Sequence, residues 1–222
     1  MKPVVAIIAH PDDETAMAGT LAAFAKEKRD VYIICVTSGD AGENHHEKKD
    51  ELLVFIREDE LRASAKILGV KHVSFVGFKD GSLSNNLYHE VAKKIENKLA
   101  EIQPDTIITF EPHGITGHLD HIAVSMITTY LFQHLPYVHT LMYSCMSVEQ
   151  RTIAASLPEY FIYFPPGYKK SEVDHVIDVS PYWDKKISAI KCHQSQKHDV
   201  ENFILPIYEK APKEEFFLKL QK

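Results

Sequence analysis

The chain has 222 residues, with 31 acidic and 25 basic side chains, a net charge of -6 and 13 histidines. This balance excludes a nucleic-acid reader, because neutralising phosphates needs an excess of Lys and Arg gathered on one face. The apolar fraction of 45% is that of an ordinary globular chain. The apolar run over residues 4–9 is far shorter than the roughly 20 residues that span a bilayer. We therefore expect one domain over residues 1–222 and no membrane anchor.

The three cysteines are an odd number, far apart in the sequence, and form no C-x-x-C pair. They are Cys35, Cys145 and Cys192. This usage excludes a disulfide framework and predicts reduced thiols in a cytoplasmic protein. The first residues enter an apolar run directly, without the features of a signal peptide.

Short apolar runs alternate with helical patterns through the first two thirds of the chain, which is typical of βαβ units and a parallel sheet. The predicted strands are residues 4–9, 31–36, 72–76, 106–110 and 140–146. The predicted helices are residues 14–28, 51–68, 87–102, 119–135 and 181–194. The fold class that follows is α/β, a single-domain, Rossmann-like open sheet, mostly parallel, with helices on both faces.

Several boundaries have a local physical cause. Gly69 marks a helix end, and Pro104 prevents a helix from continuing into the fourth strand. The pair Ser180-Pro181 predicts an N-cap followed by proline at the first helical position. Residues 147–180 are less regular, and we expect an edge strand or loops there.

The first β-to-α turn, residues 9–14, reads Ala-His-Pro-Asp-Asp-Glu. Ligands of open α/β sheets bind beyond the carboxyl ends of the strands, where the strand order reverses. A dinucleotide site would need glycines in this turn, and it has none. Instead His10 precedes Asp12, Asp13 and Glu14, whose mutual repulsion a divalent cation would offset. The alternative is that these acids only cap the helix and complement its dipole.

The second polar cluster, residues 111–121, follows the fourth predicted strand. In a sheet whose order reverses beside the first strand, this loop lies next to the first turn. His10 and one of the adjacent aspartates, together with His121, would then give two nitrogens and one carboxylate. That set suits zinc and leaves a fourth position open for water. The alternative for His118, Asp120 and His121 is a helix-start cap with incidental histidines.

The two motifs together, Ala-His-Pro-Asp-Asp-Glu at 9–14 and Gly-His-x-Asp-His at 117–121, resemble the PIG-L/LmbE-like family of zinc-dependent N-acetylglucosaminyl deacetylases. Residues 37–43, 57–69 and 193–196 are similar to further family segments. The resemblance covers most of the chain, and the pair of motifs is its specific part.

The resemblance implies a role for each matched residue. It makes Asp12 the general base and His118 the group that stabilises the oxyanion and protonates the leaving amine, with Asp120 orienting it. These roles suit amide hydrolysis, which needs an activated water, a proton acceptor and a donor to the acetyl oxygen. The zinc ligands that it implies are His10, Asp13 and His121.

Substrate contacts are predicted at Arg57, His113 and His193. Arg57 would grip a sugar hydroxyl or an acidic aglycone, or else pair with acids of its own helix. His113 would line the site or only turn its loop, and His193 would form a pocket wall or belong to an amphipathic helix. His45 and His46 lie in a polar stretch that is either a flap over the substrate or a solvated loop.

The predicted function is a zinc-dependent hydrolase that removes acetate from an N-acetylated amino sugar, a small-molecule substrate, or from its conjugate. One alternative is a divalent-metal phosphoesterase, which the two histidines and the lack of a Lys/Arg phosphate clamp disfavour. Another is a non-catalytic sugar-binding domain on the same fold. A homo-oligomer is compatible with the sequence, with residues 147–180 and the apolar tail around Phe216, Phe217 and Leu218 as candidate interfaces.

Overall fold

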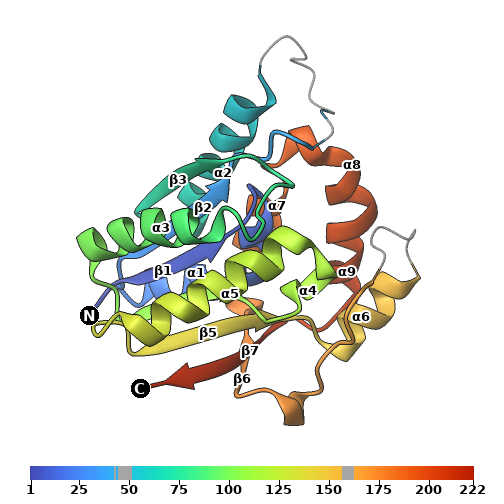
Figure 1. The fold of residues 1–222 in the computed structure, drawn as a ribbon. Helices are drawn as coiled ribbons and strands as arrows, with labels where there is room; N and C mark the ends of the chain where they lie inside the picture. The colour runs from blue at the N-terminus through green and yellow to red at the C-terminus, as the bar shows by residue number, and fades with distance from the viewer. Residues whose placement is uncertain (43, 45–51, 157–162) are drawn as a thin grey trace.

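A computed structural model describes residues 1–42, 44, 52–156 and 163–222. The described residues form one seven-stranded sheet of order β3-β2-β1-β4-β5-β7-β6 (Figure 1). Strands β1 to β5 are parallel, and β7 is antiparallel to both of its neighbours. The strands are β1 Val4–Ile8, β2 Val31–Thr37, β3 His72–Phe78, β4 Thr106–Phe110, β5 Thr140–Cys145, β6 His175–Asp178 and β7 Glu214–Gln221. This confirms the predicted α/β class and the mostly parallel sheet.

The central strand β1 is buried along its whole length, as its continuous run of Val, Ala and Ile predicts for a parallel strand covered on both faces. It pairs with β2 on one side, Val4 opposite Val31, and with β4 on the other, Val4 opposite Thr106. The strand order therefore reverses at β1. The turns that follow β1 and β4 are neighbours at the carboxyl edge of the sheet.

Helices cover both faces of the sheet. On the face toward the viewer of Figure 1, α3 (Tyr88–Ile102) packs beside α5 (Leu119–His134). The opposite face is covered by three helices in mutual contact, α1 (Ala18–Lys26), α2 (Leu53–Leu68) and α7 (Trp183–Ile190). Gly69 ends α2 in the left-handed conformation, with a φ of 84°, as predicted. Helix α3 ends two residues before Pro104.

The C-terminal third is more helical than predicted. The helix expected over 181–194 is shorter, because a 3-10 turn at Ser180–Tyr182 leads into α7, which ends at Ile190. Ser180 does not cap it: its N–H and hydroxyl both donate to Asp178. A second helical run follows, made of η4 (Gln194–Gln196), α8 (Lys197–Asp199), η5 (Val200–Ile204) and α9 (Leu205–Lys210). The sequence pattern did not predict this run, because its start is polar and Pro206 disfavours a helix interior. Proline is nevertheless tolerated in the first helical turn, which is where Pro206 lies in α9.

In the described part of the segment 147–180, the structure has the helix α6, a short 3-10 helix at Lys170–Glu172 and the edge strand β6. Helix α6 (Val148–Ala155) begins with a capping box in which Ser147 accepts from the N–H of Gln150 and the Gln150 side chain accepts in return. The Ser-x-x-Gln pattern for this helix was readable in the sequence. Strand β6 lies at the edge of the sheet, as expected.

The prediction that the apolar tail forms an interface is wrong for its phenylalanines. Phe216 and Phe217 belong to β7 and are 2% and 0% exposed. Strand β7 is inserted between β5 and β6, so both of its edges are paired. These side chains therefore serve the core of their own chain.

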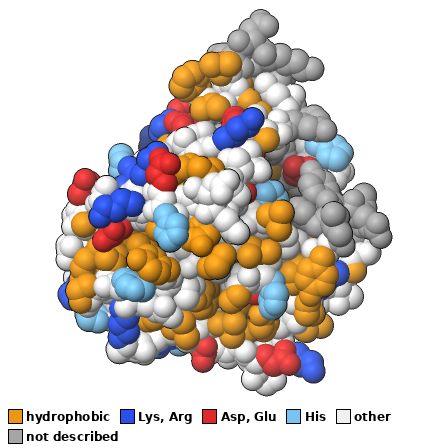
Figure 2. Space-filling model, in the orientation of Figure 1, with side chains coloured by type: hydrophobic (Ala, Val, Ile, Leu, Met, Phe, Trp, Pro, Cys, Tyr) orange, Lys and Arg blue, Asp and Glu red, His pale blue; other side chains and the backbone are white. Residues whose placement is uncertain are grey.

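The surface drawn in Figure 2 shows Lys and Arg beside Asp and Glu, with no broad basic field on this face. None of the helices in the described ranges has the length and apolar character needed to cross a membrane.

A buried ion pair joins three elements behind the site. The ammonium of Lys186 in α7 lies 2.7 Å from Oε1 of Glu215 in β7, and both side chains are buried. The Glu215 carboxylate also accepts from the N–H groups of Gly19 and Thr20, at 2.9 and 2.8 Å, in the first turn of α1. The carboxylate therefore accepts hydrogen bonds from two N–H groups that lack partners within α1, and it also neutralises the charge of Lys186.

We predict unequal effects on stability when the two partners are removed. Glu215→Ala leaves a buried ammonium unpaired and should lower the free energy of unfolding by about 3–5 kcal/mol. Lys186→Met should cost clearly less, because Glu215 keeps two backbone donors. Urea unfolding measures both, with the exposed neighbour Lys185→Met as a control expected within about 0.5 kcal/mol of wild type. Equal losses of unfolding free energy in Glu215→Ala and Lys186→Met would contradict this account.

Candidate active site

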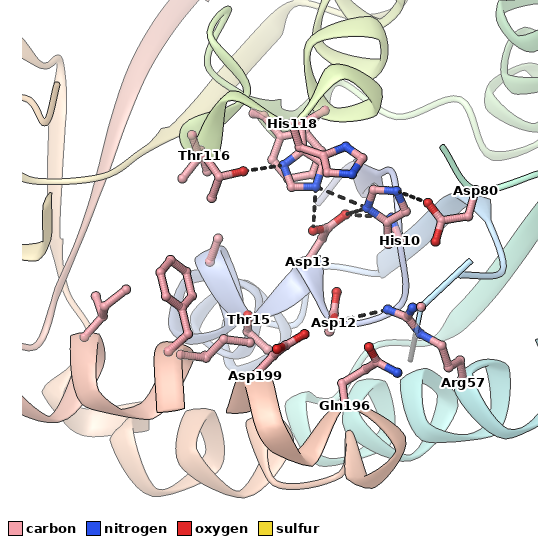
Figure 3. Close-up of a pocket in the computed structure, with 18 of the residues that line it drawn as sticks. His10, Asp12, Asp13, Thr15, Arg57, Asp80, Thr116, His118, Gln196 and Asp199 are labelled. Atoms are coloured by element: carbon pink, nitrogen blue, oxygen red, sulfur yellow. Dashed lines mark hydrogen bonds and ion pairs between the residues drawn. The ribbon is translucent and has the colours of Figure 1, made fainter. Parts of the chain in front are cut away.

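A pocket of about 470 Å³ lies at the carboxyl edge of the sheet. It is lined by the turn after β1, the loop after β4, the segment after β3, and the C-terminal helical run (Figure 3). The reversal of strand order at β1 brings these segments together, as the sequence predicted.

Three side chains converge at the base of this pocket. Nε2 of His121 lies 3.0 Å from Oδ1 of Asp13 and 3.2 Å from Nδ1 of His10. The second Asp13 oxygen lies 3.5 Å from Nδ1 of His10 and accepts from the N–H groups of Ala9 and His10. The structure thus brings together the three residues that the resemblance implies as ligands. The ring of Phe110 stacks on His121 at 4.3 Å and closes one side of the cluster.

The outer contacts of both imidazoles orient their inner nitrogens. Nε2 of His10 faces the carboxylates of Asp80, at 2.9 Å, and Asp120, at 3.3 Å, so this nitrogen is the donor. Nδ1 of His121 donates to the carbonyl of Gly114 at 3.0 Å. In the neutral rings, the remaining nitrogen lone pairs then point at each other and at Asp13. Such a set of acceptors is the arrangement that holds a metal cation.

The electrostatics of the cluster also favour positive charge at this point. Burial by itself would lower the pKa of His10, but the surrounding carboxylates of Asp120, Asp13 and Asp80 outweigh it and hold that pKa well above the usual value. For Asp13, burial would raise the pKa, and the neighbouring His121 and His10 hold it well below the usual value. A proton or a metal cation can supply the charge that these groups require.

The two adjacent aspartates point in different directions. Asp12 has a φ of 123°, a backbone conformation that residues other than glycine rarely adopt. Its carboxylate turns to Arg57, with Oδ2 3.1 Å from Nη2, while Asp13 lies between the imidazoles. Burial raises the pKa of Asp12 to about 6, against the lowering effect of Arg57. The tertiary structure therefore distinguishes two carboxylates that the sequence left equivalent.

Arg57 is buried and belongs to the site. Its Nη2 donates to the carbonyl of Pro11 at 2.8 Å and its Nη1 to the carbonyl of Gly39 at 3.1 Å. A side chain at Gly39, whose φ is 67°, would lie 2.4 Å from the guanidinium carbon, so glycine is required there. The intrahelical ion pairs of α2 are made by Arg62 instead. The alternative that Arg57 pairs within its own helix is therefore wrong.

His118 caps a helix and also lies beside the cluster of His10, Asp13 and His121, called the metal-type cluster below. Its Nδ1 accepts from the N–H of Asp120 at 3.1 Å, which places the proton of the neutral ring on Nε2. The ring centroids of His10 and His121 lie 4.7 and 5.0 Å away. Burial, together with the positive charge of these rings, lowers the pKa of His118. The helix-cap interpretation therefore holds for His118 without excluding a chemical role.

Asp120 reaches His118 through its backbone, while its carboxylate makes other contacts. The carboxylate accepts from the N–H groups of Gly81 and Leu83, at 2.8 and 3.1 Å, and contacts His10. It thus ties the segment after β3 to the start of α5. The expected orienting of His118 by this carboxylate is replaced by a main-chain hydrogen bond.

Two predicted substrate contacts lie elsewhere. His193 is 1% exposed, and its Nε2 lies 2.7 Å from Oε1 of Glu14, beneath the pocket. Burial would lower the pKa of His193, but the charge of Glu14 raises it. The other oxygen of Glu14 accepts from the N–H of Asp12 at 3.2 Å, so the pair supports the turn after β1. The side chain of His113 is 58% exposed and contacts Glu111. His193 is therefore a buried support rather than a pocket wall.

Sequence reasoning missed Asp80 and Glu111. Asp80 lines the pocket and follows β3 by two residues, so its position at the carboxyl edge of a predicted strand was the available signal. Glu111 comes directly after β4, is buried, and accepts from the N–H groups of His113 and Ile115 at 2.8 and 2.9 Å. It shapes the second loop. His45 and His46 lie outside the described residues.

The fold and the cluster define an α/β protein with a candidate divalent-metal centre at the carboxyl edge of its sheet. The sequence model of the PIG-L family, described as GlcNAc-PI de-N-acetylase, matches residues 5–132. This is more than half of the chain, and the matched part contains both motifs. The chain therefore belongs to the PIG-L family, which confirms the resemblance.

A curated relative agrees with the family assignment, and a solved structure agrees with the fold. The chain is 28% identical over 198 residues to a probable N-acetyl-alpha-D-glucosaminyl L-malate deacetylase 2 of Bacillus cereus, covering 87% of this chain and 83% of the relative. Among solved structures, N,N'-diacetylchitobiose deacetylase from Pyrococcus horikoshii matches with a TM-score of 0.70 and 23% identity, covering 99% and 84% of the two chains.

The same fold also carries different chemistry. GalB, the 4-carboxy-2-hydroxymuconate hydratase from Pseudomonas putida KT2440, matches with a TM-score of 0.71 and 17% identity, covering 100% of this chain and 97% of its own. Likeness at this level shows the fold alone. The reaction must therefore be argued from the site.

We predict that metal binding depends on the three converging side chains. His121→Ala should lose stoichiometric zinc binding, because one carboxylate and one imidazole remain. Asp12→Asn should retain it, because Asp12 faces Arg57 rather than the cluster. Metal analysis after dialysis against zinc measures both variants. Undiminished zinc in His121→Ala would contradict the assignment.

Proposed function

We propose that this protein is a zinc-dependent deacetylase that hydrolyses the acetamido group of an N-acetylated amino sugar, of the N-acetylglucosamine type, or of its conjugate. The observation that carries the proposal is the convergence of His10, Asp13 and His121 beside a half-buried Asp12. The relative from Bacillus cereus, whose name gives an N-acetylglucosaminyl substrate, supports the substrate class.

The spacing of the donors supports zinc. Ligands bound at 2.0–2.1 Å to a tetrahedral zinc lie roughly 3.3 Å apart. The two imidazole nitrogens lie 3.2 Å apart, and the Asp13 carboxylate lies 3.0 Å from His121 through Oδ1 and 3.5 Å from His10 through Oδ2. Two imidazoles with one carboxylate favour zinc over magnesium, which prefers oxygen ligands. When bound, zinc would supply an acidic water and polarise the acetyl carbonyl.

Asp12 is the proposed general base. A pKa of about 6 leaves this carboxylate ionised at neutral pH and still basic enough to accept a proton. Arg57 holds it beside the metal-type cluster rather than within it. The same carboxyl group, once protonated, is the acid that we assign to the departing amine, because the lowered pKa of His118 keeps that ring neutral, without an extra proton to give to the amine.

His118 is the proposed donor to the developing oxyanion. Its Nδ1 is fixed by the N–H of Asp120, so the neutral ring offers a proton on Nε2. The ring lies within 5.0 Å of His121 and lines the pocket. A preorganised neutral donor of this kind stabilises negative charge in the transition state.

The alternatives fit the pocket less well. A phosphoesterase needs cationic groups for the phosphate. Among the described residues that line the pocket, Arg57 is the only Lys or Arg, and Asp12 and two backbone carbonyls engage it. A non-catalytic sugar-binding domain has no need for the half-buried Asp12 carboxylate, held on a strained backbone beside His10, Asp13 and His121.

We predict that Asp12→Asn lowers acetate release by roughly 10²–10⁴-fold, because the proton acceptor is lost while the metal ligands remain. The measurement is a screen of N-acetylglucosamine conjugates with zinc present, followed for acetate and free amine. Asp59→Asn on the exposed face of α2 is the matched control and should keep wild-type activity. Unchanged turnover in Asp12→Asn would show the mechanism to be wrong.

A further inference from the structure

The pocket has an apolar wall that the proposed chemistry does not use. The polar part of the lining includes His10, Asp12 and Asp13 after β1, Arg57 and Asp80 from the β2 and β3 side, and Gln196 and Asp199 from the start of the C-terminal helical run (Figure 3). The apolar wall comes from the loop after β4, the end of β5 and the later part of the C-terminal helical run. The residues of this wall are Ile115, Met146, Phe203, Ile204, Ile207 and Tyr208. Sugar hydroxyls need polar partners, and an acetyl methyl is much smaller than such a wall.

Ile115 is held in this wall at a cost in backbone strain. Its φ is 62°, and a β-branched residue is a genuine outlier there, while the neighbouring Gly114 and Gly117 adopt positive φ without penalty. The N–H of Ile115 donates to Glu111 at 2.9 Å, which fixes the conformation. A glycine would suit this backbone better, so the retained side chain indicates a use for its apolar surface.

Phe203 and Ile204 reach the pocket from a second irregular element. They lie in the π-helical turn η5, between α8 and α9. Such turns interrupt an α-helix and recur at functional sites. The ring of Phe203 also packs edge-to-face on Phe164, with ring centroids 6.1 Å apart.

The rest of the wall combines a fixed part with an adaptable one. The ring of Tyr208 lies over the ammonium of Lys186, 3.9 Å from the ring centroid, so the buried ion pair with Glu215 anchors it. Met146 follows β5 at the carboxyl edge of the sheet, and methionine adapts to ligands of different shape.

From these contacts we infer that the substrate carries a hydrocarbon group next to the scissile amide, and that this apolar wall binds it. The inference rests on the proposed function. A hydrocarbon aglycone narrows the substrate class of that function, whereas an N-acyl chain longer than acetyl extends the same hydrolysis from acetyl to longer acyl groups. The hydrocarbon is either an N-acyl chain longer than acetyl or an alkyl or aryl aglycone on the sugar. Both present the same chemistry to the wall.

Binding to the zinc-loaded Asp12→Asn protein tests the inference without turnover. One series of ligands is the methyl, butyl and hexyl glycosides of N-acetylglucosamine, and the other is methyl glucosaminide carrying N-acetyl, N-butyryl and N-hexanoyl groups. Calorimetric Kd values should fall by roughly fourfold per buried methylene in one series. The series that responds identifies the source of the hydrocarbon. Equal Kd values along both series would overturn the inference.

Two variants test the wall itself, each made in the Asp12→Asn background. Phe203→Ala and Ile115→Gly should flatten the chain-length dependence while leaving the Kd of the methyl glycoside within about twofold. Phe55→Ala is the matched control, because Phe55 is 61% exposed on α2 and should keep the full dependence. A dependence that survives in both wall variants would also overturn the inference.

The proposed function is tested separately by acetate release from the methyl glycoside with the wild-type protein. If that release fails while binding still strengthens with chain length, the deacetylase proposal fails and the apolar site stands. If release occurs and binding ignores chain length, the reverse holds.

Discussion

The parallel pairing of β1 with β4 is the contact on which the candidate site depends. It places the turn after β1 against the loop after β4, so that His10 and Asp13 meet His121 although more than a hundred residues separate them in the sequence. Both strands are buried, and their apolar side chains stabilise the pairing through the core of the sheet. The free energy that holds the polar cluster together is therefore largely hydrophobic in origin.

The division of labour between Asp12 and Asp13 comes from one backbone conformation. With a φ of 123°, Asp12 points away from its neighbour and toward Arg57, and Asp13 is left between the imidazoles. Glu14 accepts from the N–H of Asp12, and His193 lies behind Glu14. Strain at Asp12 is thus supported by buried hydrogen bonds and ion pairs.

The imidazoles of His10 and His121 are each oriented by a contact to the ring nitrogen that faces away from Asp13. Asp80 and Asp120 face the outer nitrogen of His10, and the carbonyl of Gly114 faces that of His121. These partners fix which nitrogen lone pair faces inward, which a metal site requires. The pocket also has an apolar wall, which the hydrolysis of a plain acetamido sugar would not need.

The sequence by itself determined the α/β class, the strands β1 to β5, and the two motifs that hold His10, Asp13 and His121. Those features follow from local patterns of apolar periodicity, turn residues and short spacing. It did not determine that His193 is buried on Glu14, that Asp80 faces His10, or that the C-terminal tail becomes β7. Only the tertiary structure decided these, because each depends on which distant segment packs alongside. A histidine or a phenylalanine has the same local pattern whether its partner lies in a pocket, in the core or in solvent.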